Sequence, residues 1–139
     1  MKPGLIIICA MLPLSLCLSS CSGTKSVVVS CNDFITNNHI AQQVEMTAGS
    51  SITLSLCSNP STGFQWSESA TISDKTVIQQ VNHEFVPSEA KNTAGAAGEE
   101  VWTFKALEKG TSIISLEYSR PWEGGEKGEW TYKLTITVK

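Results

Sequence analysis

The chain has 139 residues, with 10 basic and 13 acidic side chains and five cysteines. This slightly acidic composition contains no basic stripe with interleaved aromatic residues, which argues against nucleic acid as a partner. The length suits a single domain with one hydrophobic core, and no Pro/Gly-rich linker or charge block divides the chain beyond its first residues.

The first twenty residues are predicted to be a targeting segment rather than part of the fold. Lys2 precedes an apolar run over residues 5–18, which is too short to span a bilayer because about 20 residues are needed. The tetrapeptide at 18–21 is similar to the lipobox of bacterial lipoproteins, in which the cysteine is lipidated and becomes the new N-terminus. We therefore expect a lipoprotein signal peptide over residues 1–20 and a membrane anchor on Cys21. An ordinary secretory signal is the alternative, with Cys21 an incidental thiol or a disulfide partner.

Both versions predict an exported domain. Removal of the signal leaves nine basic and thirteen acidic side chains, because Lys2 leaves with it. Residues 21–26 are expected to form a short tether, and residues 27–139 the folded domain. Ser22 is not the aspartate that often retains bacterial lipoproteins at the inner membrane, so the sequence favours the outer membrane in an organism that has two.

Two cysteines of the mature domain remain to be placed. Cys31 and Cys57 would lie in an oxidising compartment, where a disulfide is permitted. Two buried free cysteines acting as small hydrophobic residues fit the sequence as well. A metal site that combines them with His39 and His83 is the weakest option, since no two of these residues have the close spacing of metal ligands.

Alternation of apolar and polar residues predicts short strands throughout the domain. In residues 130–138, for example, every second residue is large and apolar, which indicates a strand with one buried face. Strands are predicted in chain order at 27–31, 40–46, 52–56, 64–69, 77–85, 102–106, 114–118 and 130–138. About eight strands without a convincing amphipathic helix predict an all-β, immunoglobulin-like antiparallel β-sandwich. Trp66, Trp102 and Trp130 are expected in its core or flanking it.

Three segments between these strands have the composition of exposed turns. If successive strands run up and down, connections separated by an even number of strands leave the sandwich at the same end, so all three segments are predicted to share one binding edge. The segments are Asn59, Pro60, Ser61, Thr62 and Gly63; Gly95, Ala96, Ala97 and Gly98; and Arg120, Pro121 and Trp122.

Each segment has a physical reason for its composition. Pro60 stiffens the first turn and Gly63 permits a positive φ, which would hold the intervening residues at a small, uncharged tip. In the second, glycines around two alanines let backbone groups approach a partner, including by extended pairing, and the adjoining residues 92–97 are expected to be flexible. Trp122 combines a large surface with few rotatable bonds, as interface anchors do.

Together these residues carry a resemblance to the chagasin family of inhibitors of papain-like cysteine proteases. The resemblance covers most of the mature domain and rests on residues 59–66, on 95–98 followed by 102–106, and on 117–122 before the last strand. Ser61 and Phe64 depart from the usual pattern, where Thr and Tyr are common. The first departure could alter affinity, and the second concerns core packing.

The resemblance implies reversible occlusion of a protease cleft. The first loop would enter at the catalytic Cys and His of the protease, with Thr62 nearest the chemistry, while the other two loops clamp the flanks. A monomer without a cofactor is expected. An immunoglobulin-like lipoprotein module for adhesion, without inhibitory activity, is the alternative. An enzyme is the least favoured class and no catalytic residue is predicted, because no nucleophile motif is present and His39 and His83 have no evident orienting partner.

Overall fold

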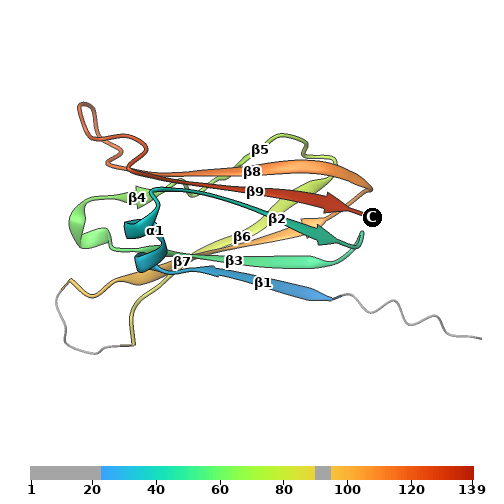
Figure 1. Cartoon of the computed structure of the whole chain (residues 1–139), viewed down its shortest axis with the longest axis horizontal. Coiled ribbons are helices and arrows are strands. Elements are labelled where there is room, and N and C mark those ends of the chain that lie inside the picture. The colour runs from blue at the N-terminus through green and yellow to red at the C-terminus, as the bar shows by residue number, and fades with distance from the viewer. Residues whose placement is uncertain (1–22, 90–94) are drawn as a thin grey trace, which may run out of the picture.

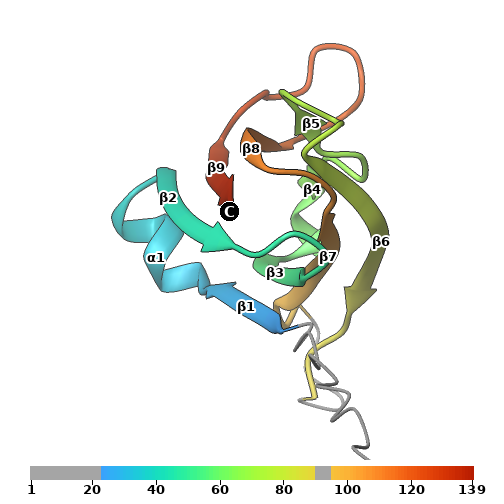
Figure 2. The ribbon, with the colours of Figure 1, turned by 90° about the vertical axis from the view of Figure 1, so that its right-hand side faces the viewer.

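The computed structural model describes residues 23–89 and 95–139, so the signal segment and Cys21 lie outside the described part of the chain. Two β-sheets pack face to face as a sandwich, as Figures 1 and 2 show. The first sheet has the order β1 (Thr24–Val29), β3 (Ser51–Ser58), β7 (Gly98–Ala106) and β6 (Ile78–Val86). The second has the order β2 (His39–Met46), β9 (Trp130–Val138), β8 (Gly110–Ser119) and β4 (Gln65–Trp66), with β5 (Thr71–Ile72) also on β8. The predicted all-β, immunoglobulin-like sandwich is confirmed.

Two strand pairs at the edges of the sandwich are parallel rather than antiparallel. β1 pairs in parallel with β3, and β2 pairs in parallel with β9. The reason is the helix α1 (Cys31–Thr36), which follows β1 and leads into β2 on the other sheet. β1 runs towards α1 and β2 runs back from it along the other sheet. β1 therefore has the same direction as β3, and β2 has the same direction as β9. All other pairs are antiparallel, as expected.

Two details of the predicted elements were wrong. β1 begins at Thr24, so the last part of the expected tether pairs with β3 instead. Cys31 starts α1 rather than ending a strand. Within the described residues there are nine strands, in agreement with the prediction of about eight, because the predicted strand at 64–69 is replaced by the two short strands β4 and β5. The helix was missed because six residues are too few to show a helical period, although Ser30 and Asp33 form a capping box that marks its start.

The core shows the predicted alternation. In β7 the buried residues are Gly98, Glu100, Trp102, Phe104 and Ala106, which face the second sheet while their neighbours face outward. Near the loop-bearing end the core is aromatic: Phe34 stacks on Trp130 with ring centroids 4.9 Å apart. Tyr118 and Trp66 join this cluster at a centroid distance of 5.0 Å. Trp66 and Trp102 are buried and Trp130 is half-buried, as expected.

The alternatives for the two cysteines of the domain are resolved in favour of a disulfide. Cys31 is bonded to Cys57, with Cα atoms 5.1 Å apart. The bond joins the first residue of α1 to the end of β3, and the Cys57 carbonyl also accepts a hydrogen bond of 2.9 Å from the Trp66 ring. Both thiols are therefore consumed beneath the first of the three loops.

Candidate functional site

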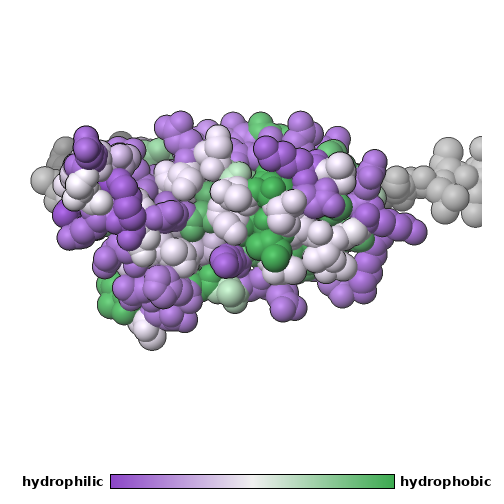
Figure 3. All heavy atoms as spheres, turned by 90° about the horizontal axis from the view of Figure 1, so that it is seen from above, coloured by the Kyte–Doolittle hydropathy of each residue, from purple (hydrophilic) through white to green (hydrophobic). Residues whose placement is uncertain are grey.

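The three segments singled out in the sequence lie at one end of the sandwich. They belong to the β3–β4, β6–β7 and β8–β9 connections, which leave the same end in Figure 1. We call them the first loop (59–63), the second loop (95–98) and the third loop (120–122), and their end of the sandwich the loop end. The opposite end, where β1 starts and β9 finishes, is the far end. Figure 3, seen from above, shows mostly hydrophilic side chains at the loop end and a hydrophobic area nearer the middle.

The first loop is a short turn bonded to itself. Residues Pro60–Thr62 form the 3-10 helix η1, closed by Gly63 at a φ of 82°. The Asn59 carbonyl accepts hydrogen bonds from the Thr62 backbone N–H at 3.1 Å and from the Thr62 hydroxyl at 2.7 Å. The Ser61 hydroxyl donates to Asn59 Oδ1 at 2.6 Å. Both hydroxyls at the tip are thus used to stiffen the turn, which remains exposed and uncharged.

The turn rests on a buried tyrosine. The Tyr118 hydroxyl accepts a hydrogen bond of 2.9 Å from the Asn59 backbone N–H. Tyr118 is itself only 2 % exposed and stacks on Phe64 and Trp130. A buried tyrosine hydroxyl needs a polar partner, so the start of the first loop is fixed to the core.

The second loop is tied to the first by one side chain. The amide nitrogen of Asn59 donates to the Gly95 carbonyl at 3.0 Å, and Gly95 has a φ of 78°. Ala97 is exposed and Ala96 is half-buried. Gly98 was predicted as part of the exposed loop, but it is buried as the first residue of β7, where a Cβ would lie 2.5 Å from the Val86 carbonyl oxygen. Residues 92–94 of the stretch predicted to be flexible lie outside the described part of the chain.

The third loop is tied to the first by an arginine. Arg120 Nη2 donates to the Thr62 carbonyl at 3.2 Å, and the guanidinium lies 4.5 Å from the centre of the Phe64 ring. A glutamate follows on the other side, with Arg120 Nη1 and Glu126 Oε2 3.7 Å apart. Arg120 was predicted as a contact for a protease. The structure directs its side chain between two loops, where it can position both, and the contact with a protease stays a prediction.

Trp122 is the exposed aromatic residue of the third loop, at 52 %. Its ring passes over Gly63 so closely that a Cβ there would lie 2.7 Å from the ring. Two residues that the sequence did not single out hold it: Gly125 N–H and the Lys127 ammonium each donate to the Trp122 carbonyl, both at 3.0 Å. Gly124 and Gly125, which follow Trp122 closely, were the signal in the sequence for this tight turn.

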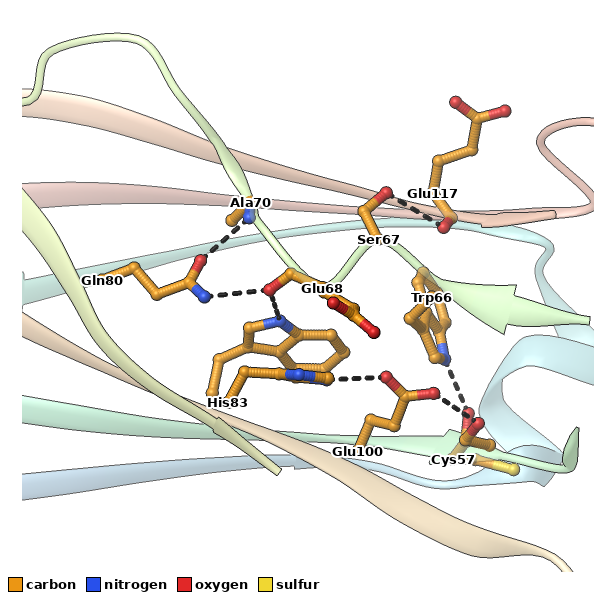
Figure 4. A network of polar contacts seen from close by, with 11 residues as sticks. Cys57, Trp66, Ser67, Glu68, Ala70, Gln80, His83, Glu100 and Glu117 are labelled. Carbon is orange, nitrogen blue, oxygen red and sulfur yellow. Dashed lines mark hydrogen bonds and ion pairs between the residues drawn. The ribbon is translucent and has the colours of Figure 1, made fainter. Parts of the chain in front are cut away.

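A polar network lies beneath the first loop, as Figure 4 shows. His83 was expected to be isolated, but its Nε2 lies 2.8 Å from Glu100 Oε2 and its ring packs on Trp102. The other carboxylate oxygen of Glu100 accepts from the Ser58 hydroxyl at 2.9 Å. The network therefore supports the residue that precedes the first loop. The Glu100 carboxylate lies between the His83 imidazole and the Ser58 hydroxyl, so the three groups are not arranged as a nucleophile and its base.

The second histidine, His39, is exposed, and its Nδ1 lies 2.9 Å from the Thr131 hydroxyl. Within residues 23–89 and 95–139, no three His, Cys, Asp or Glu side chains are grouped so that they could hold a metal ion. The chemistry of the loop end is thus that of a rigid surface: a small polar tip, an exposed tryptophan and backbone groups beside them.

Comparison with known proteins agrees with this geometry. The model of the chagasin family of peptidase inhibitors matches residues 45–136, and chagasin of Trypanosoma cruzi is 32% identical over 92 residues, which are 65% of this chain and 83% of that protein. The fold is similar to that of the cysteine protease inhibitor EhICP2 of Entamoeba histolytica, with a TM-score of 0.64 at 20% identity over 84% of this chain and 97% of the other. It is also similar to PbICP-C, solved in complex with falcipain-2, with a TM-score of 0.63 at 16% identity over 83% and 99%. The chain belongs to the chagasin family of peptidase inhibitors.

Proposed function

We propose that this chain inhibits papain-like cysteine proteases reversibly, by filling the active-site cleft with the three loops at the loop end. Membership of an inhibitor family makes the chain an inhibitor rather than an enzyme. The class of target is supported by the similarity to chagasin and by the relative that was solved in complex with falcipain-2.

The observation that carries this mechanism is that the three loops form one connected unit. Asn59 bonds the first loop to the second, while Arg120 and Trp122 bring the third against the first. A surface that is already fixed before binding loses little conformational entropy in the complex. The first loop then acts as the wedge and Trp122 as the anchor at its flank.

The same bonds explain how a loop can lie in a protease cleft without being cut. Cleavage requires local opening of the segment that is cleaved. The Thr62 hydroxyl and backbone both bond to the Asn59 carbonyl, and Gly63 N–H bonds to the Pro60 carbonyl at 3.0 Å. Opening η1 breaks all of these bonds together, so the turn is expected to resist hydrolysis.

Titration of papain with the purified domain tests the proposal. We expect stoichiometric, competitive loss of activity that is restored on dilution, with the inhibitor intact by mass. Thr62→Asp should weaken inhibition, because it brings a carboxylate towards the catalytic thiolate and removes the hydroxyl donor that closes η1. Thr62→Ser keeps that donor and serves as the matched control. Slow hydrolysis of the domain would indicate a substrate, and no effect on papain would favour an adhesion module.

We also propose that the domain is exported and anchored by a lipid on Cys21. The support is the signal-like segment followed by a lipobox-like tetrapeptide at 18–21. No helix of the described residues is both long enough and apolar enough to cross a bilayer. Cys21→Ser should move the protein from the membrane fraction to soluble or unprocessed forms, and unchanged detergent partitioning would exclude the anchor.

A further inference from the structure

Charge is distributed unequally along the long axis of the sandwich. The loop half, which contains α1, the ends of β6 and β8 and the start of β7, carries nine of the thirteen carboxylates and two cations among the described residues. The carboxylates are Asp33, Glu84, Glu89, Glu99, Glu100, Glu117, Glu123, Glu126 and Glu129. The cations are Arg120 and Lys127, so this half is strongly negative.

The far end has the opposite sign. Five lysines lie in or beside its turns, together with three carboxylates: Lys25, Lys75, Lys105, Lys109 and Lys139, with Glu45, Asp74 and Glu108. Glu45 is already paired with the Lys139 ammonium at 2.9 Å. Lys75, Lys105 and Lys109 are exposed and form no ion pair with any described residue, so their charges are available to a partner.

The proposed lipid anchor would be attached next to this basic end. β1 begins at Thr24, at the far end in Figure 1, three residues after Cys21. Three residues reach at most about 10 Å even when fully extended. This is close to the Debye length of about 8 Å at physiological ionic strength, so lysines at the far end would interact with phosphate groups at the membrane surface.

We propose that the far end is a membrane-facing surface that holds the domain upright on an anionic bilayer. A domain lying on its side would bring the carboxylates of the loop half within a Debye length of the lipid phosphates, which is unfavourable. In the upright orientation the lysines face the bilayer and the carboxylates face away from it. The inference rests on the proposed anchor, which supplies the proximity, while the charges select the orientation.

The upright orientation has a consequence for inhibition. The ten residues of β8 rise by about 3.3 Å each, so the loop end stands about 33 Å beyond the far end. This is several Debye lengths from the lipid phosphates. The three loops therefore stay accessible to a protease in the aqueous space, which approaches without meeting the charged surface.

Energy transfer from labelled, lipidated full-length protein to an acceptor on lipid headgroups tests the orientation. One label goes on Ala48→Cys in the β2–β3 turn of the far end, and another on Glu123→Cys beyond the third loop; the native cysteines 31 and 57 stay paired. Transfer from residue 48 should be high on all vesicles. Transfer from residue 123 should be about twofold lower on vesicles with phosphatidylglycerol than on phosphatidylcholine alone, and about 0.5 M salt should abolish the difference because it screens the charges.

Charge variants provide the matched control. Replacing Lys75, Lys105 and Lys109 together with Gln should abolish the dependence on phosphatidylglycerol, whereas Lys133→Gln, on the middle of β9, should preserve it. Equal transfer from residue 123 on both vesicles, in protein whose mass shows the lipid, would overturn this inference alone. Absence of the lipid on Cys21 would overturn the proposed anchor and the orientation with it.

Discussion

The first and third loops meet at the same end of the sandwich but are built in opposite ways. The first loop is held from within and from below, by its own hydroxyls and by the buried hydroxyl of Tyr118. The third loop has an outward-facing tryptophan whose carbonyl accepts hydrogen bonds from the Gly125 N–H and the Lys127 ammonium. The first loop thus provides rigidity, and the third loop provides contact area. Arg120 joins the two, since its guanidinium bonds the first loop from the third.

The largest expected effect concerns stability beneath the first loop. A disulfide across 26 residues contributes about 3.5 kcal/mol by limiting the unfolded chain. The double variant Cys31→Ser and Cys57→Ser should lose about this much unfolding free energy in urea. Where it is still folded, its inhibition constant should change less than about threefold, because the loop contacts remain. A large loss of inhibition without a loss of stability would contradict the view that the disulfide stabilises the fold and the loops alone contact the protease.

Truncation of the exposed anchor should act on binding instead. Trp122→Ala should raise the inhibition constant for papain about thirtyfold, equivalent to about 2 kcal/mol, as truncation of an interface anchor does. The side chain is 52 % exposed, so the melting temperature should change little. Ile113→Ala, at 40 % exposure on β8, is the control and should leave inhibition unchanged. Unfolding of the Trp122 variant would show that this tryptophan is part of the core.

Replacing Gly63 with alanine tests the contact between the first and third loops. A second glycine variant measures the effect of backbone strain without that contact. Gly63→Ala adds a Cβ at a positive φ and displaces the Trp122 ring, so inhibition should weaken about tenfold. Gly49→Ala carries the same strain at a φ of 87° in the β2–β3 turn, with open space around it. Both variants should lose similar stability, by about 1 kcal/mol in urea unfolding. If both variants inhibit papain equally well, inhibition does not depend on the contact between the first and third loops.

The link between the first and second loops is tested by a change of one atom. Asn59→Asp keeps an acceptor for the Ser61 hydroxyl but replaces the donor to the Gly95 carbonyl with an oxygen. Loss of that bond should cost about 1 kcal/mol and weaken inhibition about fivefold. Asn38→Asp adds the same charge before β2 and should have little effect on the inhibition constant. Equal inhibition by all three proteins would make the position of Gly95 irrelevant to binding.

The smallest effect is a pH dependence at α1. A hydrogen bond from the Ser30 hydroxyl, together with one from its backbone N–H, lowers the pKa of Asp33 below its usual value of 3.8. Because the folded pKa is depressed, Asp33 stabilises the fold above about pH 4, and that contribution is lost as the pH falls through the folded pKa. The difference in melting temperature between the parent and Asp33→Asn should therefore shrink towards pH 2. A difference that is constant with pH would contradict the capping box.

The sequence was sufficient for the sandwich, its core and the common end of the three loops, because each depends on alternation along strands. It could not reveal contacts between residues far apart in the chain. The bond from Asn59 to Gly95 spans 36 residues and that from Arg120 to Thr62 spans 58. Gly98 was misassigned for the same reason, since its pairing with Ser58 of β3 and its closeness to Val86 of β6 place it in β7.

Hydrogen exchange of the domain, free and bound to papain, tests the central claim most directly. Occlusion by the loop end predicts that new protection is concentrated at residues 59–63 and 120–122, with the β2–β3 turn at the far end unchanged. Papain whose catalytic cysteine is already blocked by a bulky covalent inhibitor should give no protection. New protection at the far end, or equal protection by blocked papain, would show that the protease is bound by another surface.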